Sequence, residues 1–282
     1  MTTAQATRLG TLYIVATPIG NRNDISMRAL ETLKTVDFIL AEDTRHSQPL
    51  LSSLGIKKPL SSLHAHNEAH KSETVIQALQ SGQSIALISD AGTPLISDPG
   101  FPLVQKARLS GIDVVPIPGP CALIAALSAA GIPSDIFTFA GFLPAKETAR
   151  KSRLEALKSL THTLIFYEST HRILDTLGDI ASVFGKDFKL VLAKELTKAF
   201  ERFVTGSAGE IQDWLNDDKN RCKGEFVLIL PARAAEAADN GSNELLSTLL
   251  DELPLKQAVK LACKITGLPK NELYQKALDL NG

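Results

Sequence analysis

The chain has 282 residues, of which 44% are hydrophobic, and its 30 Lys and Arg against 31 Asp and Glu give a formal net charge of −1. This length exceeds a typical single domain and the apolar fraction is sufficient for substantial cores, so we expect two domains or more. The near-zero charge excludes a general basic field that would attract nucleic acid, and any such binding must come from local patches.

The cysteines Cys121, Cys222 and Cys263 are scattered and form no CxxC pair. This spacing argues against a disulfide framework and against a zinc site, and we expect no bound metal. Residues 1–10 are polar, unlike a signal peptide, and no apolar run approaches the roughly 20 residues of a membrane span. We therefore expect a cytoplasmic protein that does not engage membranes.

Strand and helix patterns alternate from residue 12 to about residue 140. The expected strands are 12–16, 36–41, 59–63, 84–88, 112–116 and 136–140, with helical patterns between them. Such alternation is typical of an α/β layer with a largely parallel sheet. Residues 141–146, Gly-Phe-Leu-Pro-Ala-Lys, are expected to be a linker to the next domain.

Three of these strands end in a Gly/Pro loop that leads into a helix. The loops are Thr17 to Asn21, with Asp24 as the expected N-cap of the following helix, Ser89 to Gly100 before a helix at 101–109, and Pro118 to Cys121 before a helix at 122–130. Ligands bind beyond the carboxyl ends of strands in an open α/β sheet, so we expect the three loops to share one pocket.

The central loop, SDAGTPLISDPG, has the residues that a ligand site needs. Gly92 allows a ligand to approach the backbone, Pro94 stiffens the loop, and Asp90 can accept a hydrogen bond from a hydroxyl or ammonium group. Taken alone, the stretch is also typical of an ordinary turn, and the other two loops favour the binding site. No GxGxxG fingerprint and no P-loop lysine motif is present, so this is not an ordinary dinucleotide site.

The second half of the chain predicts another α/β domain and a helical tail. Its expected strands are 162–167, 189–193, 200–205 and 225–230, and its expected helices are 147–160, 170–184 and 207–217. Residues 231–243 are small and polar and predict a flexible tether. The resulting domains are 11–141, 142–231 and 241–282.

The tail has purely helical periodicity. Its apolar stripes are Leu255, Val259, Ala262 and Ile265, then Leu273, Ala277 and Leu280, separated by a helix break at Gly267-Leu268-Pro269. This pattern fits a helix-turn-helix unit, and it fits equally a small helical bundle that docks on the core.

Charged residues follow the second and third strands, at 42–46 and 64–68. Arg45 can bind a phosphate with both arms of its guanidinium, and Asp43 or Glu68 can orient or deprotonate a hydroxyl. His64 and His66 alternate along the chain, so only one of them would face the site. The alternatives are an N-cap with a local ion pair for the Asp43 segment, and a helix cap for the histidine pair.

Several long motifs together resemble a known family. They are VATPIGN (15–21), AEDTRHS (41–47), SDAGTPLISDPG (89–100), PGPCA (118–122), FYESTHRI (166–173) and AKELTK (193–198). They resemble the tetrapyrrole methylase superfamily of S-adenosylmethionine (SAM) enzymes, and more narrowly its branch that acts on small-subunit ribosomal RNA. The resemblance covers nearly the whole chain.

This resemblance implies a fold, an assembly and a reaction. The fold would be two α/β domains of the class III SAM methyltransferase type plus a small C-terminal helical module, and the protein would be a homodimer. The reaction would be SAM-dependent 2′-O-methylation of a cytidine ribose in small-subunit (16S) ribosomal RNA, either free or in the assembled subunit.

The resemblance also implies the site residues. In the family, backbone atoms of the glycine loops hold SAM and residues of the second domain wall its adenine. The matching positions are Ser89, Asp90, Ala91, Gly92, Thr93, Pro94, Leu95, Ile96, Ser97, Pro118, Gly119, Pro120, Cys121, Ala122, Tyr167, Leu196, Glu225 and Phe226. Tyr167 also fits the edge of a core with its hydroxyl in water.

For catalysis we expect Asp43, Glu68 and Arg45. For RNA binding we expect Arg45, His64 and the stripe Lys256, Lys260 and Lys264, although such a stripe is also typical of a solvated helix face.

Two other functions fit the sequence. One is a SAM methylase of a small tetrapyrrole, which would not need the lysine stripe of the tail. The other is a non-enzymatic nucleic-acid-binding protein with a degenerate α/β body, which a measured SAM affinity would distinguish from both enzymes.

Overall fold

The computed structural model describes residues 9–233 and 239–281. The chain divides into two compact units, residues 1–232 and 233–282, and each is described here by itself. The first unit contains two five-stranded sheets, and the second is helical. Among the described residues, no helix combines the length and apolar character needed to cross a membrane.

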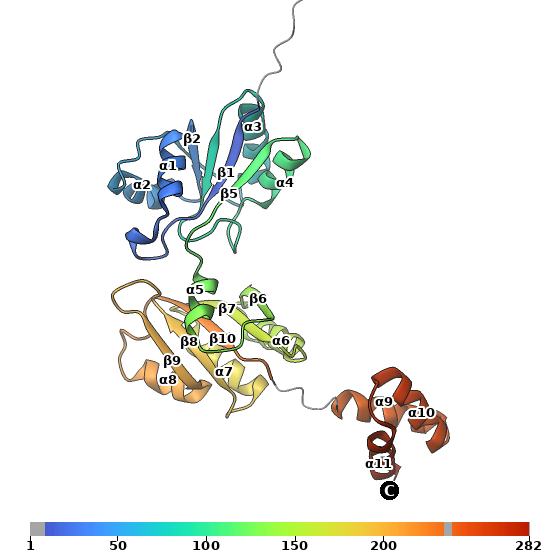
Figure 1. The fold of residues 1–282 in the computed structure, drawn as a ribbon. Coiled ribbons are helices and arrows are strands. Elements are labelled where there is room, and N and C mark those ends of the chain that lie inside the picture. The colour runs from blue at the N-terminus through green and yellow to red at the C-terminus, as the bar shows by residue number, and fades with distance from the viewer. Residues whose placement is uncertain (1–8, 234–238, 282) are drawn as a thin grey trace, which may run out of the picture. The chain divides into compact units, whose positions relative to one another are not determined.

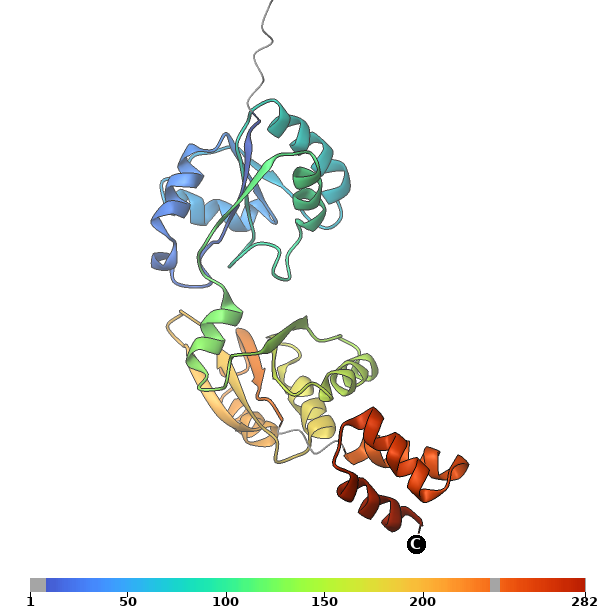
Figure 2. The same ribbon diagram turned by 45° about the vertical axis from the view of Figure 1, so that its right-hand side comes forward.

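The first sheet is entirely parallel, with strand order β3-β2-β4-β1-β5. Its strands are β1 (Thr11–Val15), β2 (Phe38–Ala41), β3 (Leu60–Ser62), β4 (Ile85–Ile88) and β5 (Asp113–Ile117). A 3-10 turn, η1 (Arg22–Asp24), precedes α1 (Met27–Thr35). Helices α1 and α2 (Thr44–Ser53) cover one face, and α3 (Glu68–Gln80) and α4 (Phe101–Leu109) cover the other (Figures 1 and 2).

Alternation along the strands explains this double cover. Leu12 and Leu87 pack with α3 and α4, whereas the residues that follow them, Tyr13 and Ile88, pack with α1 and α2. Both faces of the strands are therefore buried, as expected for a parallel sheet.

The second sheet is mixed, with strand order β6-β7-β10-β8-β9. Its strands are β6 (Phe137–Phe142), β7 (Thr163–Ser169), β8 (Lys189–Lys194), β9 (Arg202–Ser207) and β10 (Glu225–Leu230). Only β6 and β7 pair in parallel; the other pairs are antiparallel.

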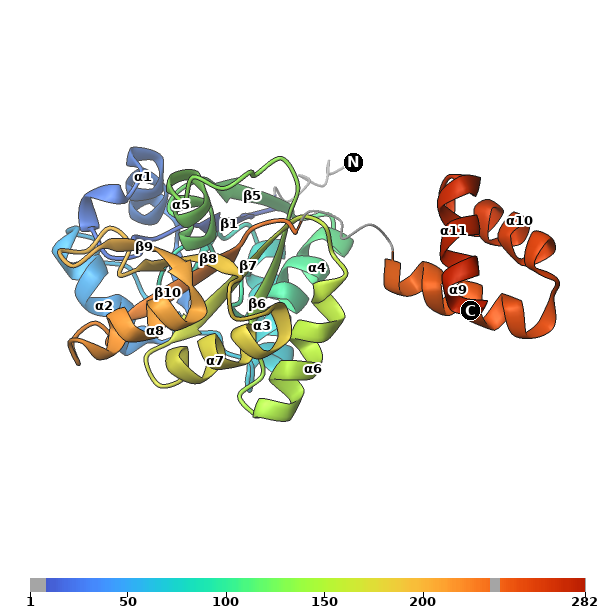
Figure 3. The same cartoon turned by 90° about the horizontal axis from the view of Figure 1, so that it is seen from below.

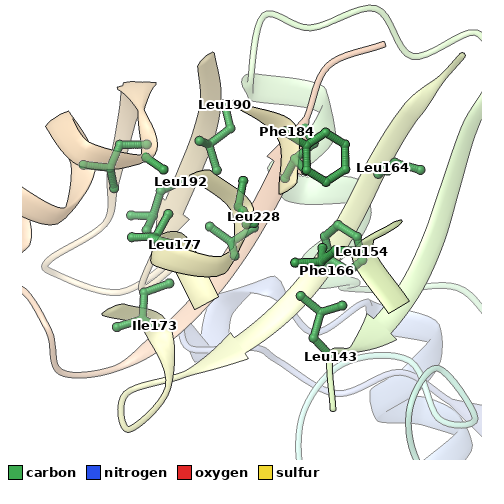
Figure 4. Packing of buried hydrophobic residues seen from close by; sticks show 14 of the residues in the cluster. Leu143, Leu154, Leu164, Phe166, Ile173, Leu177, Phe184, Leu190, Leu192 and Leu228 are labelled. Atoms are coloured by element: carbon green, nitrogen blue, oxygen red, sulfur yellow. The ribbon is translucent and has the colours of Figure 1, made fainter. Parts of the chain in front are cut away.

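Helices cover both faces of the second sheet as well. Three of them, α6 (Glu147–Lys158), α7 (Ile173–Phe184) and α8 (Ala208–Asn216), share one face (Figure 3). Figure 4 shows Leu154 of α6 and Leu177 of α7 on the same face of the sheet as Phe166 and Leu228. The opposite face is covered by α5 (Ala122–Ala129), whose Leu123 and Leu127 contact Val227.

The strand expected at 136–140 belongs to the second sheet and not to the first. It is β6, which pairs with β7, and α5 also packs on this second sheet. The chain therefore passes from one sheet to the other between β5 and α5, and residues 141–146 do not separate the sheets. The error arose because sequence alternation shows that a strand exists but not which strand it pairs with.

Two local predictions are also wrong. The N-cap of α1 is Ser26, whose side chain accepts a hydrogen bond from the Ala29 amide, and not Asp24, which lies in η1. The tether expected at 231–243 is helical from Asp239 onward, and its residues 234–238 lie outside the described part of the chain.

The helical unit consists of α9 (Asp239–Glu252), α10 (Leu255–Thr266) and α11 (Lys270–Asn281). Its core contains Leu246, Val259, Ala262, Leu273 and Ala277. The predicted break is confirmed, since Gly267 ends α10 in the left-handed conformation with φ 72°. Ile265 and Leu280, expected on the buried stripes, are instead 61% and 46% exposed.

Candidate functional site

The three Gly/Pro loops lie in contact because β4, β1 and β5 are neighbours in the first sheet. Thr17 and Gly92 exchange backbone hydrogen bonds of 2.9 and 3.0 Å. The hydroxyl of Thr93 donates to the carbonyl of Pro120 at 2.9 Å. One bonded set of loops therefore forms the carboxyl edge of the sheet, where ligands bind in open α/β folds.

A cleft of about 430 Å³ opens beside these loops, with walls from both sheets of the first unit. From the first half, its lining is Ile19, Asp90, Ala91, Gly92, Thr93, Ile96, Ser97, Asp98, Cys121 and Ala122. From the second half, it is Phe142, Tyr167, Glu168, Ser169, Thr170, His171, Leu196, Gly224, Glu225, Phe226 and Val227. The volume lies in the range of roughly 300–1,000 Å³ that is usual for small-ligand sites.

The loop after β4 has an unusual backbone. Gly92 has φ 82°, and Leu95 and Ser97 have φ values of 72° and 76°, although side chains disfavour this region. A Cβ on Gly92 would lie 3.3 Å from Cγ2 of Ile19. Strained conformations of this kind persist where the surrounding structure enforces them, and they concentrate at ligand sites.

Tyr167 joins the two walls of the cleft. Its hydroxyl accepts a hydrogen bond from the Leu123 amide, in the first turn of α5, at 3.0 Å. Burial raises the pKa of this phenol, and the neighbouring Cys121 adds to the effect. Tyr167 is thus a neutral structural wall, and its hydroxyl is not free in water as the alternative interpretation held.

The cleft has a distinctly acidic side. Burial raises the pKa of Asp98 to about 6, and the negative charges of Glu42 and Asp90 contribute to the increase. The pKa of Glu42 is likewise raised, by burial and by Asp90. This side of the cleft therefore attracts cations, and Asp98 can hold or release a proton near neutral pH.

The other two carboxylates of the lining are engaged by cations. Glu168 receives Nε and Nη2 of Arg172 at 2.9 and 2.7 Å and the hydroxyl of Thr176 at 2.7 Å. Glu225 is mostly exposed and pairs with Lys198 at 2.9 Å. Neither carboxylate is as available as Asp98 to accept a proton from a bound molecule.

Most of the residues that we expect to bind the cofactor do line this cleft. The exceptions are Ser89, Pro94, Leu95, Pro118, Gly119 and Pro120. Two of these bind lining residues: the Ser89 hydroxyl donates to the Ala91 carbonyl at 3.2 Å, and the Pro120 carbonyl accepts from the Thr93 hydroxyl.

The residues expected to perform catalysis do not line the cleft. Asp43 caps α2 by accepting the Arg45 amide at 2.8 Å, and it also binds the Arg45 guanidinium with both oxygens, at 3.1 and 2.7 Å. The local alternative, an N-cap with an ion pair, is therefore confirmed for this segment. Glu68 accepts the Gly100 amide at 2.6 Å, which ties α3 to the loop that precedes α4.

The residues expected to bind RNA lie on two different units. His64 donates its backbone amide to Asn67 Oδ1 at 2.9 Å, and its ring lies edge-on to His66 at 6.0 Å. Lys256, Lys260 and Lys264 are all exposed on α10. Within the described residues, no three His, Cys, Asp or Glu side chains are arranged to hold a metal ion.

Sequence reasoning missed several lining residues, namely Ile19, Asp98, Phe142, Glu168, Ser169, Thr170, His171, Gly224 and Val227. Four of them belong to the FYESTHRI motif, from which only Tyr167 was selected. Asp98 belongs to the second turn of the central loop, Ser97 to Gly100, which in the sequence is typical of an ordinary turn. Phe142 falls in the stretch expected to be a linker, because a phenylalanine between Gly141 and Leu143 gives no sign of a cleft in the sequence.

Comparisons with known proteins match both units. A family model described as "Tetrapyrrole (Corrin/Porphyrin) Methylases" covers residues 11–212, and one described as "RsmI C-terminal HTH domain" covers residues 234–281. The chain is 54% identical over 275 residues to "Ribosomal RNA small subunit methyltransferase I" of Escherichia coli O157:H7, covering 97% of this chain and 96% of that protein.

A second relative and a solved structure extend these matches. The protein of the same description from Pasteurella multocida (strain Pm70) is 54% identical over 273 residues, which are 96% of this chain and 97% of the relative. Uroporphyrin-III C-methyltransferase from Thermus thermophilus, solved in complex with S-adenosyl homocysteine, has a TM-score of 0.53 at 15% identity over 79% of this chain and 97% of that one. This last likeness supports the fold alone.

Proposed function

The chain belongs to the tetrapyrrole methylase family, in the branch of the ribosomal RNA small subunit methyltransferase I proteins, and from that premise we propose that it transfers a methyl group from SAM to the 2′-hydroxyl of a cytidine in small-subunit ribosomal RNA. The observation that carries the proposal is the cleft at the carboxyl ends of β1, β4 and β5, formed by the motifs through which the chain resembles this family.

The residues of the cleft fit the cofactor. Gly92 leaves the backbone accessible, and Ile19, Leu196 and Phe226 provide apolar surface for an adenine. Asp90 and Asp98 add negative charge, which suits a cationic sulfonium. When bound, SAM supplies a methyl group that is reactive toward an oxygen nucleophile.

The chain's own contribution is to position the acceptor and to take its proton. A hydroxyl held in line with the methyl group gains most of its rate from orientation. We assign the proton to Asp98, because it lines the cleft without a basic partner among the described residues and its pKa of about 6 is closer to neutrality than that of an ordinary carboxyl group. Asp98 would take the proton of the hydroxyl, while the methyl carbon would leave the sulfur of SAM for the hydroxyl oxygen and the thioether would be released.

We propose that Asp43 and Glu68 position the loop after β4, Glu68 through its bond from the Gly100 amide, and do not themselves take the proton. The Asp43 amide donates to Oδ1 of Asp90 at 3.1 Å, so this segment supports the acidic side of the cleft from outside. Arg45, with a side chain 89% exposed, is proposed to contact an RNA phosphate.

The helical unit is proposed to supply further RNA contacts through Lys256, Lys260 and Lys264. Cytoplasmic location and a homodimer are proposed from the family resemblance, and a mass measurement in solution tests the dimer.

The test offers methyl-labelled SAM and the full-length protein three acceptors: small ribosomal subunits from a strain that lacks the enzyme, RNA extracted from them, and a free tetrapyrrole. Label in the subunit or its RNA supports the proposal, and the preference between these two identifies the natural acceptor. Label in the tetrapyrrole alone would assign the protein to small-molecule methylation. A protein that does not bind SAM could methylate neither RNA nor a tetrapyrrole.

A further inference from the structure

Phe142 is an exposed aromatic ring inside the cleft. It ends β6 with 52% of its surface exposed, although it lines the cleft beside Tyr167. Exposure alone is ordinary for a surface phenylalanine, but this ring lies in a cleft, where a bound molecule can cover its apolar face.

A β-bulge turns this ring into the cleft. Between the pairs Phe139–Ile165 and Phe142–Tyr167, β6 advances by three residues while β7 advances by two. In a regular strand, residue 142 would face away from residue 139, and the extra residue returns it to the same side. Phe139 and Phe142 both lie edge-on to Tyr167, at 4.7 and 5.7 Å.

The bulge depends on glycine and lies next to the central loop. Gly141 has φ 65°, which other residues disfavour, and a Cβ at this position would lie 3.7 Å from Oγ of Ser97. Phe142 is therefore aimed at the space that the strained loop lines from the other wall.

A fixed cation accompanies the ring. The guanidinium of Arg172 lies 5.9 Å from the centroid of Phe142. Its Nη1 donates to the Leu143 carbonyl at 3.0 Å, and its Nε and Nη2 bind the buried Glu168. The arginine cannot move away without leaving Glu168 unpaired, so ring and cation form one rigid platform.

We propose that Phe142, steadied by Arg172, is the stacking platform for the base of the RNA nucleotide that receives the methyl group. This inference rests on the proposed function and names the acceptor part of the same cleft. Enzymes that act on a nucleotide within folded RNA take it out of its stack, and proteins hold such bases on aromatic faces and arginine planes. Arg172 and Glu168 together carry no net charge, so this wall offers a base an aromatic face and a guanidinium plane, whereas the opposite, acidic side of the cleft suits the sulfonium.

The test compares three substitutions at this position in the full-length protein, Phe142→Ala, Phe142→Leu and Phe142→Tyr. The control is Phe137→Ala, which removes a 38% exposed phenylalanine at the other end of the same strand. SAM affinity is measured by calorimetry, and KM and kcat are measured with unmodified small ribosomal subunits.

Loss of one stacked base weakens binding by roughly 5- to 150-fold, so Phe142→Ala should raise the KM for subunits within that range. Phe142→Leu should behave like Phe142→Ala, because it keeps apolar volume without a π face. Phe142→Tyr should have a near-normal KM, because it keeps the aromatic face. All three Phe142 variants should bind SAM with normal affinity, and Phe137→Ala should have a normal KM and a normal SAM affinity.

Three results would overturn the platform while leaving the proposed function intact. These are a normal KM for Phe142→Ala, a Phe142→Leu variant as good as Phe142→Tyr, or a fall in SAM affinity with an unchanged KM, which would assign the ring to the cofactor. An unsubstituted protein that binds SAM but never methylates subunits would instead reject the proposed function itself.

Discussion

Thr17 and Gly92 exchange two backbone hydrogen bonds, of 2.9 and 3.0 Å, across 75 positions of sequence (92 minus 17). This pair joins the loop after β1 to the loop after β4 and forms the floor of the cleft. With φ 82° and only 3.3 Å from an added Cβ to Ile19, Gly92 can accept a side chain only if the floor moves.

Gly92→Val is therefore expected to lower SAM affinity by about tenfold or more, because it strains the loop and fills space that the ligand needs. Gly55→Val is the matched control. Gly55 also has a positive φ, 70°, but nothing lies within 4 Å of an added Cβ. Calorimetry should show normal affinity for Gly55→Val, and equal affinities for the two folded variants would mean that the cofactor binds elsewhere.

The pKa of Asp98, raised to about 6, predicts how activity depends on pH. The single-turnover rate should rise as pH increases through about 6, because the carboxylate must be ionised to accept a proton. Asp98→Asn, measured at saturating SAM, should be slow and should lose this rise. The groups that face Asp98 are Glu42, Asp90 and Tyr167, so Glu42→Gln should shift the rise to lower pH.

Asp43→Asn and Glu68→Gln are the comparators for this measurement. Both residues lie outside the cleft lining, so we expect smaller rate losses for these variants than for Asp98→Asn. If either variant lost more rate than Asp98→Asn, the residue replaced in it, and not Asp98, would be the proton acceptor.

The same pKa makes a separate prediction about stability. The folded-state pKa of Asp98 lies above its unfolded value, so folding favours the protonated form. Its contribution to stability is fully present below the unfolded pKa of roughly 3.9 and is lost as pH rises through about 6. Asp98→Asn should therefore have a higher thermal midpoint than the unsubstituted protein at pH 8, with the difference vanishing near pH 4. A constant difference would mean that Asp98 does not titrate in this way.

Breaking the Glu168–Arg172 pair should lower the free energy of unfolding by more than breaking a surface ion pair does. The side chain of Glu168 is 0% exposed, so Arg172→Ala leaves a buried carboxylate without its cation. Glu168 keeps its bonds from Ser169 and Thr176, so we expect a loss of about 3 kcal/mol, the lower end of the range for a broken buried pair. In urea denaturation, the exposed control Arg45→Ala should leave the midpoint unchanged, and equal midpoints for both variants would contradict the structural role.

The lysines of α10 predict a salt dependence. If Lys256, Lys260 and Lys264 each meet a phosphate, replacing all three with alanine should reduce the log–log salt slope of RNA binding by about 2, since each contact on single-stranded RNA contributes roughly 0.7. SAM affinity should not change. Alanine at Lys57, Lys186 and Lys219, exposed lysines of the α/β unit, is the charge-matched control, and the same slope in both triple variants would rule out specific contacts by α10.

The strands were largely predictable because their periodicity is local. β10, at Glu225–Leu230, coincides with the predicted run, and α4 begins at Phe101 and ends at Leu109 as the pattern indicated. Pairing is a tertiary property, which is why β6 was placed in the wrong sheet. The loops of the cleft were predictable because glycine and proline interrupt the strand and helix patterns and so mark where each element ends.

The chemistry was less predictable, because a carboxylate has the same sequence signature whether it caps a helix or faces a ligand. Asp43 looked catalytic and is a helix cap, whereas Asp98 looked like part of a turn and lines the cleft. Phe142 depends on a bulge at Gly141, and nothing in the sequence around it indicates the register shift that aims its ring.

The most direct test of the central claim is the chemical identity of the methylated nucleoside. Small subunits that lack the modification are incubated with SAM and the full-length protein, and their ribosomal RNA is digested completely to nucleosides for mass spectrometry. The account predicts one new product, 2′-O-methylcytidine, whose yield at sub-saturating SAM falls when Gly92→Val replaces the unsubstituted protein. A methyl group on a base, on another ribose, or on no nucleoside at all would contradict it.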